Sequence, residues 1–305
     1  MNSPVLAEDK LWMTDGGLET TLVFHHGIDL PCFATLPLLQ SEEHRNLLAK
    51  YFRSYAEIAN QNGMGFILDT LTWRGSRDWG TQLGFDDEEL RKLNRDSVEF
   101  ARGLMTGAEN VVLNGVVGPR GDGYSVDQKM SEEEAEQYHR AQIEVLAQAG
   151  VEMITVLTMN YPEEAIGVAR AAVSSGVPVI VSFTVETDGR LPSGELLESA
   201  ISRVDEATGF APLFYMVNCA HPSHFSHLLD SGASWTFRLG GVRVNCSTKS
   251  HAELDESTEL DIGDPLDLAE RVCGLVPRLP NLRVVGGCCG TDTRHLRSIA
   301  ERLNQ

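Results

Sequence analysis

Two adjacent cysteines, Cys288 and Cys289, stand in a glycine-rich segment that carries the most specific chemical signal of this sequence. The segment reads Gly-Gly-Cys-Cys-Gly-Thr over 286–291 and follows an apolar run. Glycine permits a tight turn that lets both thiols face one point, whereas a disulfide between neighbouring residues needs a strained ring. Soft thiolates suit Zn²⁺ better than they suit a hard, oxygen-seeking cation. The pair therefore predicts two ligands of a metal ion.

Cys219 is the candidate for a third ligand. It follows Asn218 at the end of a short apolar run. If this run and the run before the cysteine pair are parallel strands of one barrel, their ends meet at the same mouth. Three thiolates would then leave a fourth tetrahedral position for a substrate atom. The remaining cysteines, at 32, 246 and 273, are predicted to be small core residues or free thiols, because six cysteines in 305 residues are too sparse for a disulfide scaffold.

Three histidines, at 221, 224 and 227, form a competing candidate for a metal site. Their spacing drifts around a helix, so at most two of the three side chains could share one ligand sphere. We therefore predict that these histidines lie on the surface or at a helix start.

The elements that must position these residues alternate between strand and helix along the whole chain. Apolar or β-branched runs predict strands at Leu11–Asp15, Gly65–Thr70, Val111–Val117, Met153–Thr158, Val177–Thr184, Phe214–Cys219, Gly240–Asn245 and Leu282–Gly287. Amphipathic stretches predict helices at Ser41–Asn62, Asp86–Gly107, Ser131–Gly150, Pro162–Gly176, Ser193–Thr208, Pro222–Gly232, Asp264–Leu279 and Asp292–Leu303. This alternation predicts the α/β class and a single (β/α)8 TIM barrel domain over residues 1–305. A doubly wound sheet is the alternative, but no Gly-x-Gly-x-x-Gly follows the first strand.

Polar residues stand where most of the predicted strands end, and we predict that they contact substrate. In a barrel these ends form one mouth, where the active sites of such barrels lie. The Asp15-Gly16-Gly17 segment also fits a turn that merely ends a strand. The candidates at the strand ends are Asp15, Gly16, Gly17, Thr70, Thr184, Asn218 and Asn245.

Composition excludes several classes of partner. The 305 residues include 25 Lys and Arg against 44 Asp and Glu, a net charge of −19. Such acidity argues against nucleic acid or an anionic membrane as a partner. No segment has the pattern of a signal peptide, and no apolar run reaches 18 residues. We therefore expect a cytoplasmic protein.

Taken together, these motifs resemble the homocysteine S-methyltransferase family, which includes the betaine-dependent and S-methylmethionine-dependent enzymes. The resemblance is carried by Asp15-Gly16-Gly17 with Thr20-Thr21-Leu22, Gly115 to Pro119, Ser182-Phe183-Thr184, Val217-Asn218-Cys219 and the Gly286–Thr291 segment. It implies a (β/α)8 barrel in which Cys219, Cys288 and Cys289 hold Zn²⁺. It also implies an enzyme of methionine biosynthesis that moves a methyl group from a sulfonium or quaternary ammonium donor to a zinc-bound thiol, homocysteine or a related one.

The resemblance assigns no catalytic group beyond the zinc site, and the donor is expected to be held by an acidic and aromatic mouth. Glu19, Asp69 and Trp73 are the candidates for holding this cation, Trp73 through a cation–π contact. Two alternatives stay open: another zinc barrel enzyme such as a hydrolase, and a non-catalytic zinc or thiol sensor.

One position departs from the family pattern. Members that use homocysteine carry a glutamate at the end of the fourth strand, where it holds the amino group of the substrate. The matching residue here is Leu157, with the register set by Glu163-Glu164-Ala165. An apolar side chain cannot pair with an ammonium group. A thiol without the amino group is therefore an alternative acceptor. Arg74 also differs from the aromatic residue of the betaine enzymes, and we predict a surface arginine or a carboxylate contact there.

Overall fold

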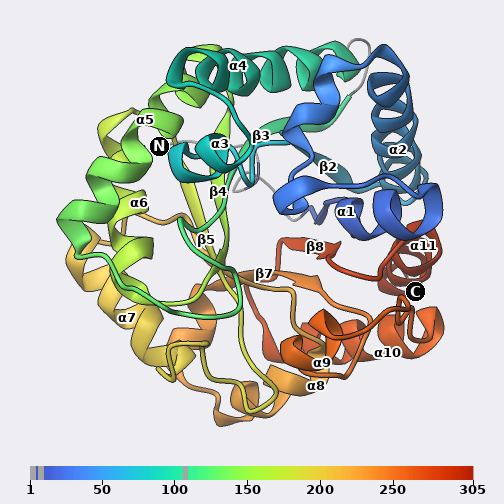
Figure 1. Ribbon diagram of the computed structural model, residues 1–305. Coiled ribbons are helices and arrows are strands. Elements are labelled where there is room, and N and C mark those ends of the chain that lie inside the picture. Colours follow the sequence, from blue (N-terminus) through green and yellow to red (C-terminus); the bar gives the residue numbers. More distant parts are fainter. Residues whose placement is uncertain (1–4, 6–9, 106–108, 305) are drawn as a thin grey trace.

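Eight parallel strands form a closed barrel in the computed structural model, which describes residue 5 and residues 10–105 and 109–304. Each strand pairs with its neighbours in sequence, and β1 closes the ring against β8 (Figure 1). The prediction of a TIM barrel is therefore confirmed. The strands are β1 Trp12–Met13, β2 Gly65–Asp69, β3 Val111–Val117, β4 Met153–Met159, β5 Val179–Phe183, β6 Tyr215–Asn218, β7 Leu239–Val244 and β8 Val284–Gly287.

Helices surround the barrel as an outer ring (Figure 1). The longer ones are α2 Glu42–Gln61, α4 Asp87–Leu104, α5 Glu132–Ala149, α6 Pro162–Ser174, α7 Leu197–Thr208, α10 Pro265–Leu275 and α11 Thr293–Leu303. Their starts follow local rules, since Asp86 and Ser131 each form a capping box with a glutamate three residues later. The predicted helix over 222–232 was wrong in its second half: α8 ends at Phe225 and a 3-10 helix, Ser226–Ser231, follows.

Several short elements in the loops escaped prediction. They are α1 Leu18–Thr20, the π-helix Thr21–His25, α3 Arg77–Gln82, α9 His251–Asp255, and the 3-10 helices Pro31–Phe33, Leu36–Gln40 and Ser234–Arg238. A further 3-10 helix, Val276–Arg278, continues α10 within the helix predicted for 264–279. Elements of three to six residues carry too few periodic positions for a pattern to register. Two of them, α1 and α9, carry residues of the site described below.

The barrel interior is a packed core, so the site must lie above it. The core side chains inside the barrel are Trp12, Ile67, Val112, Met153, Ile180, Phe214, Met216 and Val284, and Leu157 packs against them. Gly65 makes room for the Trp12 indole, because a Cβ there would lie 2.3 Å from the ring. Apolar residues closing the bottom of the barrel leave the mouth at the carboxyl ends of the strands as the place for chemistry.

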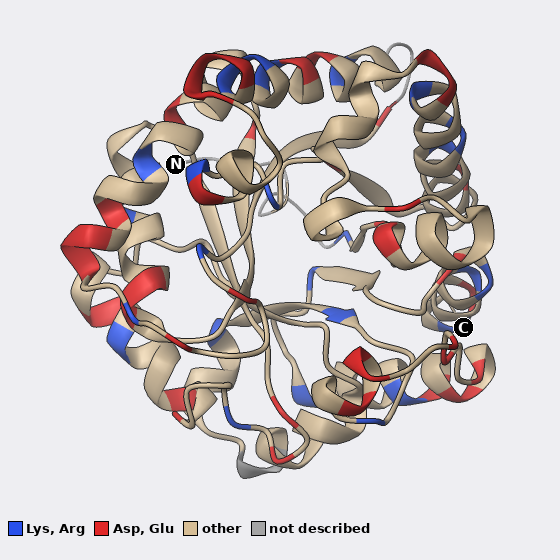
Figure 2. Ribbon diagram, viewed as in Figure 1, with Lys and Arg blue, Asp and Glu red and all other residues tan. Residues whose placement is uncertain are grey.

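Charged side chains gather on the outer helices and loops (Figure 2). Acidic residues occupy the first turns of α4 and α5, where they interact favourably with the helix dipole. In the part of the chain that the structure describes, no helix is long and apolar enough to cross a membrane.

Candidate metal centre and active site

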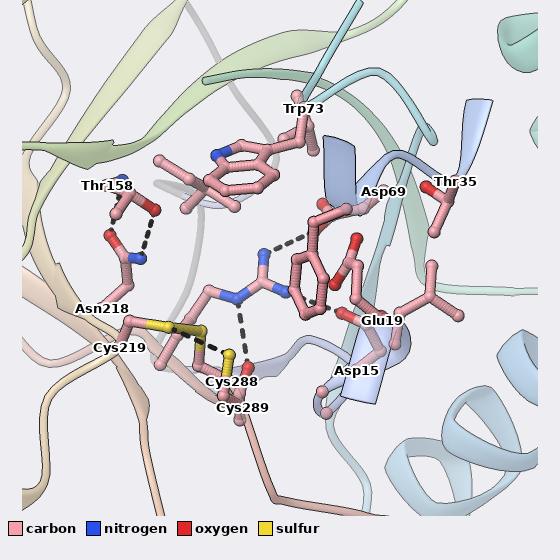
Figure 3. Close-up of a pocket in the computed structure, with 18 of the residues that line it drawn as sticks. Asp15, Glu19, Thr35, Asp69, Trp73, Thr158, Asn218, Cys219, Cys288 and Cys289 are labelled. Atoms are coloured by element: carbon pink, nitrogen blue, oxygen red, sulfur yellow. Dashed lines mark hydrogen bonds and ion pairs between the residues drawn. A yellow bond between two sulfur atoms is a disulfide. The ribbon is translucent and has the colours of Figure 1, made fainter. Parts of the chain in front are cut away.

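Cys219, Cys288 and Cys289 converge at the mouth of the barrel, as the sequence predicted. Their sulfur atoms all lie within 4.8 Å of one another (Figure 3). Cys219 and Cys288 form a disulfide, and the Cys289 sulfur lies 3.7 Å from that of Cys219. The sequence predicted no disulfide here, and this bridge joins two of the three cysteines that together could hold a metal ion. The barrel places their Cα atoms 5.3 Å apart, within the span of a disulfide.

Tight backbone geometry presents the three sulfurs to one point. Cys219 has φ of 53°, in the left-handed region that non-glycine residues seldom adopt, and Gly290 closes the turn after the pair with φ of 76°. Thr291 fastens this turn, since its hydroxyl donates to the Cys288 carbonyl at 2.7 Å. Gly287 is needed beside it, because a Cβ there would lie 2.1 Å from the Thr291 hydroxyl oxygen.

The donor set fits a thiophilic metal ion. In a tetrahedral site with Zn–S bonds of about 2.3 Å, two sulfurs lie about 3.8 Å apart, and Cys219 and Cys289 are 3.7 Å apart. Burial raises the pKa of the Cys289 thiol to about 12, so a positive ion would offset the cost of the buried thiolate. Cys219 and Cys288 must be reduced before they can bind a metal. These three residues, once reduced, could hold one.

A cavity of about 80 Å³ lies beside the cysteines and opens to solvent. Figure 3 shows the cysteines on one side of it, Asp15, Asp69 and Glu19 on the other, and Trp73 over both. Of the predicted substrate contacts, Asp15, Gly16, Gly17, Glu19, Thr70, Trp73 and Asn218 line this cavity. Thr184 and Asn245 are buried and do not line it. The substrate roles of all nine residues stay predictions.

Asn218 and Thr70 reach the cavity wall with side chains that other protein groups already bind. The Asn218 amide accepts a hydrogen bond from the Thr158 backbone N–H at 2.9 Å and one from the Ser182 hydroxyl at 2.6 Å. Thr70 accepts a hydrogen bond from the Val116 N–H at 3.0 Å. In the described structure both side chains therefore shape the wall.

Arg243 joins two carboxylates under the cavity. One guanidinium nitrogen lies 2.7 Å from Asp15 Oδ1, and the other contacts Asp69 Oδ2. Tyr51 and Asn114 donate further hydrogen bonds to Asp15 and Asp69, at 3.1 and 2.7 Å. Burial raises the pKa of Asp15 to about 7, although Arg243 opposes the rise. For Arg243, burial favours the neutral form, but the two aspartates outweigh it and raise its pKa.

Sequence reasoning placed Arg243 near the end of a strand but gave it no role, although a signal was present: a charged residue inside an otherwise apolar strand, β7. A buried cation needs partners of opposite charge. Asp15 and Asp69, at the ends of two other strands, were the candidates for the ion-pair partners of Arg243.

Asp15 and Asp69 are both paired with Arg243, so Glu19 is the cavity carboxylate that is available to bind a ligand. It is half-buried on α1, and within the described ranges it forms no ion pair. Burial raises its pKa, while Arg243 and Arg74 oppose the rise. A cation in the cavity would find this carboxylate uncommitted.

Arg74 is buried, so the expectation of a surface arginine was wrong. Its guanidinium carbon lies 4.0 Å from the Trp73 ring centroid and 3.7 Å from that of Trp79. It also donates to the Gly121 carbonyl at 2.9 Å. One cation therefore already stacks on Trp73, so a second one would have to use another part of this ring.

Tyr124, from the loop after β3, was also missed by sequence reasoning, because an irregular loop gives no periodic signal. Its hydroxyl lies 3.1 Å from the Cys219 sulfur. Burial raises the pKa of Tyr124, so the hydroxyl stays protonated and can donate to sulfur.

The histidine cluster does not assemble a metal site among the residues that the structure describes. His221 caps α8 by accepting from the Ser223 N–H, and His224 bonds the Thr248 carbonyl at 3.0 Å. The prediction of surface or helix-start positions is confirmed: His221 caps α8, His224 lies in its first turn and His227 is exposed, although His221 and His224 are buried.

Comparison with known proteins gives one family. The family model for homocysteine S-methyltransferase matches residues 12–303. Betaine–homocysteine S-methyltransferase 1 of Rattus norvegicus is 25% identical over 257 residues, which cover 78% of this chain and 60% of the rat protein. Homocysteine S-methyltransferase 4 of Zea mays is 25% identical over 323 aligned positions, covering 96% of this chain and 89% of the maize protein.

A solved structure has the same fold over nearly the whole chain. The homocysteine methyltransferase MmuM from Escherichia coli, in its oxidized form, is 20% identical with a TM-score of 0.76, covering 98% of each chain. This chain spans only about 60% of the length of the rat enzyme, so what that whole protein does is not carried over as a finding.

Proposed function

This chain belongs to the homocysteine S-methyltransferase family, and from that premise we propose that it is a zinc-dependent enzyme that transfers a methyl group from a sulfonium or quaternary ammonium donor to a thiol. The observation that carries the proposal is the meeting of Cys219, Cys288 and Cys289 beside a cavity at the barrel mouth. The acceptor is homocysteine or a related thiol.

The reaction exchanges one bond to a methyl carbon for another. The acceptor sulfur attacks the methyl carbon, and a new carbon–sulfur bond forms as the bond to the donor sulfur or nitrogen breaks. The bonding electrons leave with the donor, which becomes a neutral thioether or amine, and the thiol proton goes to solvent. A zinc ion held by three thiolates would supply the acceptor in its nucleophilic, deprotonated form near neutral pH.

The protein's own residues then have two tasks, which are positioning and exclusion of water. Glu19 offers a carboxylate to the positive donor, and desolvation in the cavity strengthens that attraction. Leu71, Val116 and Leu157 form an apolar part of the cavity wall, which keeps water away from the reacting atoms.

The test is a methyl-transfer assay on reduced protein. We expect about one zinc per chain after reduction and metal loading, and a thioether product by mass spectrometry when a thiol is offered with S-methylmethionine, S-adenosylmethionine or betaine. Zinc bound without transfer to any thiol would contradict the proposal and favour a sensor.

Glu19→Gln tests how the donor is held. A sulfonium or quaternary ammonium centre has no hydrogen to donate, so the carboxylate attracts it by charge alone. Two opposite unit charges about 4 Å apart attract by about 4 kcal/mol at an effective dielectric constant of about 20, so KM for the cationic donor should rise roughly tenfold or more while zinc content stays unchanged. Glu57→Gln, on the exposed face of α2, is the control. An unchanged donor KM in the Glu19 variant would mean that another group holds the cation.

Leu157→Glu tests the acceptor. Leu157 lines the cavity and is half-buried, so a carboxylate there could meet an amino group. The comparison substrate is 4-mercaptobutanoate, which lacks the amino group. The ratio of kcat/KM for homocysteine to kcat/KM for this thiol should rise by about tenfold in the variant, because a hydrogen bond between charged groups is worth about 1.5–3 kcal/mol. Leu157→Gln has nearly the same shape without the charge, and it should leave the ratio near the wild-type value. An equal ratio in all three proteins would show that the amino group is held elsewhere.

A further inference from the structure

Resting on the proposed function, we propose that Glu186 and His251 are a positioning pair that holds Cys219 in its ligand conformation and thereby sets the metal affinity of the three-cysteine cluster. His251 lies on α9, in the loop between β7 and α10. Neither residue touches the cavity, so their effect must pass through the residues that they bind.

Cys219 needs such support because of its backbone. Its φ of 53° lies in a region that side chains with a Cβ disfavour, and it directly follows the end of β6. Its N–H donates to the Arg243 carbonyl at 3.0 Å, and its carbonyl accepts from His251 Nε2 at 2.7 Å. The two bonds hold the peptide groups on both sides of the Cα atom, so they decide where the sulfur points.

His251 is itself fixed from several sides. Glu186, after β5, lies 2.9 Å from Nδ1, on the side of the ring opposite the Cys219 carbonyl at Nε2. Both partners accept hydrogen bonds, so the ring makes both when each nitrogen carries a proton, and the carboxylate then fixes its orientation. His251 is 8% exposed. Ser250 starts α9 with a capping box closed by Glu253, which holds His251 in the first turn.

A second contact leads from His251 to the Cys219 sulfur. The imidazole packs against the Tyr124 ring, with centroids 4.2 Å apart and planes tilted by 30°. The Tyr124 hydroxyl lies 3.1 Å from the Cys219 sulfur. His251 therefore orients both the backbone of this ligand and the phenol that donates to its sulfur.

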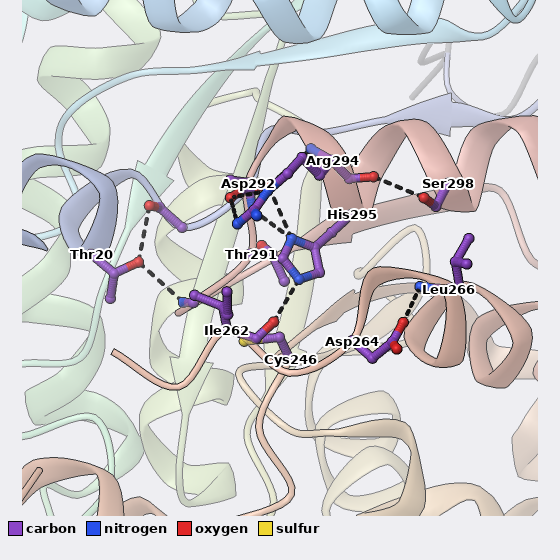
Figure 4. Close-up of polar contacts among 12 residues, drawn as sticks. Thr20, Cys246, Ile262, Asp264, Leu266, Thr291, Asp292, Arg294, His295 and Ser298 are labelled. Carbon is purple, nitrogen blue, oxygen red and sulfur yellow. Dashed lines mark hydrogen bonds and ion pairs between the residues drawn. The ribbon is translucent and has the colours of Figure 1, made fainter. Parts of the chain in front are cut away.

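The loop that carries His251 is tied down at its far end (Figure 4). His295 donates from Nε2 to the Ile262 carbonyl at 2.7 Å, and Asp292 lies 3.1 Å from Nδ1 of the same ring. The Cys246 thiol, near the start of the loop, donates to the Asp261 carbonyl at 2.9 Å. Because both ends of the loop are held, His251 stays in contact with the Cys219 carbonyl.

The measurement is zinc affinity of the reduced full-length protein, by competition with a chromophoric chelator at constant pH. Loss of a hydrogen-bond partner behind a metal ligand typically costs about 10–100-fold in affinity, and we expect His251→Phe, which keeps a ring against Tyr124, to lose that much. The His251→Gln side chain can still donate to the Cys219 carbonyl, so this variant should keep a substantial part of the wild-type zinc affinity. The zinc affinity of Glu186→Gln should lie between that of wild type and that of His251→Phe.

The matched control is His139→Phe. His139 is a fully buried imidazole that also pairs with a carboxylate, Glu164 at 2.8 Å, but on the outer helix α5. Its loss should lower the melting temperature and leave zinc affinity unchanged. The cobalt-substituted proteins give a second readout, since a displaced Cys219 thiolate changes the thiolate-to-cobalt charge-transfer band.

Wild-type zinc affinity in a folded His251→Phe or Glu186→Gln variant would overturn the positioning role. Equal loss of affinity in His139→Phe would also overturn it, since the effect would then be one of general stability. Failure of the proposed function looks different: wild-type protein would bind zinc, respond to these substitutions, and still transfer no methyl group.

Discussion

Cys289→Ala is expected to remove zinc binding and methyl transfer together. Two remaining thiolates cannot form the three-ligand site, and no other described cysteine, histidine or carboxylate group joins the cluster to replace the third. Metal analysis after chelator challenge should find no retained zinc, and product formation should fall to background. Cys288→Ala and Cys219→Ala should behave in the same way, with the disulfide lost as well.

Cys273→Ala is the control for these variants. This half-buried cysteine lies on α10, outside the cluster. Its removal should leave zinc content and activity unchanged. Full activity in the Cys289 or Cys288 variant would refute the site assignment, whatever the control shows.

Arg243→Met is expected to destabilise the fold more than any other single change at the site. The substitution leaves two buried carboxylates, Asp15 and Asp69, without their shared cation. Removing one partner of a buried ion pair typically costs about 3–5 kcal/mol in the free energy of unfolding. The midpoint of urea denaturation, monitored by circular dichroism, measures this loss.

Two comparisons separate the buried cluster from charge loss in general. Arg77→Met breaks an exposed ion pair with Asp87, in which both side chains are more than 60% exposed, and should cost less than about 1 kcal/mol. Adding Asp15→Asn and Asp69→Asn to Arg243→Met should restore part of the lost stability, because no charge then stays buried alone. An Arg243→Met midpoint equal to that of Arg77→Met would contradict the role given to the cluster.

Sequence and structure agree most closely where the signal was local. The apolar runs became parallel strands because parallel strands of a barrel are covered on both faces, and the helix starts followed from Asp86 and Ser131 as caps. The glycines around Cys288 and Cys289 indicated a tight turn that brings both thiols to one metal ion. Once a barrel was inferred, Cys219 had to share a mouth with the pair, and this nonlocal prediction was confirmed over a separation of 69 residues.

What the sequence by itself determined was therefore the barrel and the three converging thiols, which follow from local pattern plus one rule about strand ends. The family came from the resemblance of its motifs to known proteins. Only the tertiary structure decided the partners of Arg243, which lies 228 residues from Asp15, and the contact of His251 with Cys219. It also decided that Cys219 bonds Cys288 in the described state. The physical reason is that hydrogen bonds and ion pairs act over about 3 Å. Pattern places a residue on an element, but strand register and loop path decide which atoms come that close.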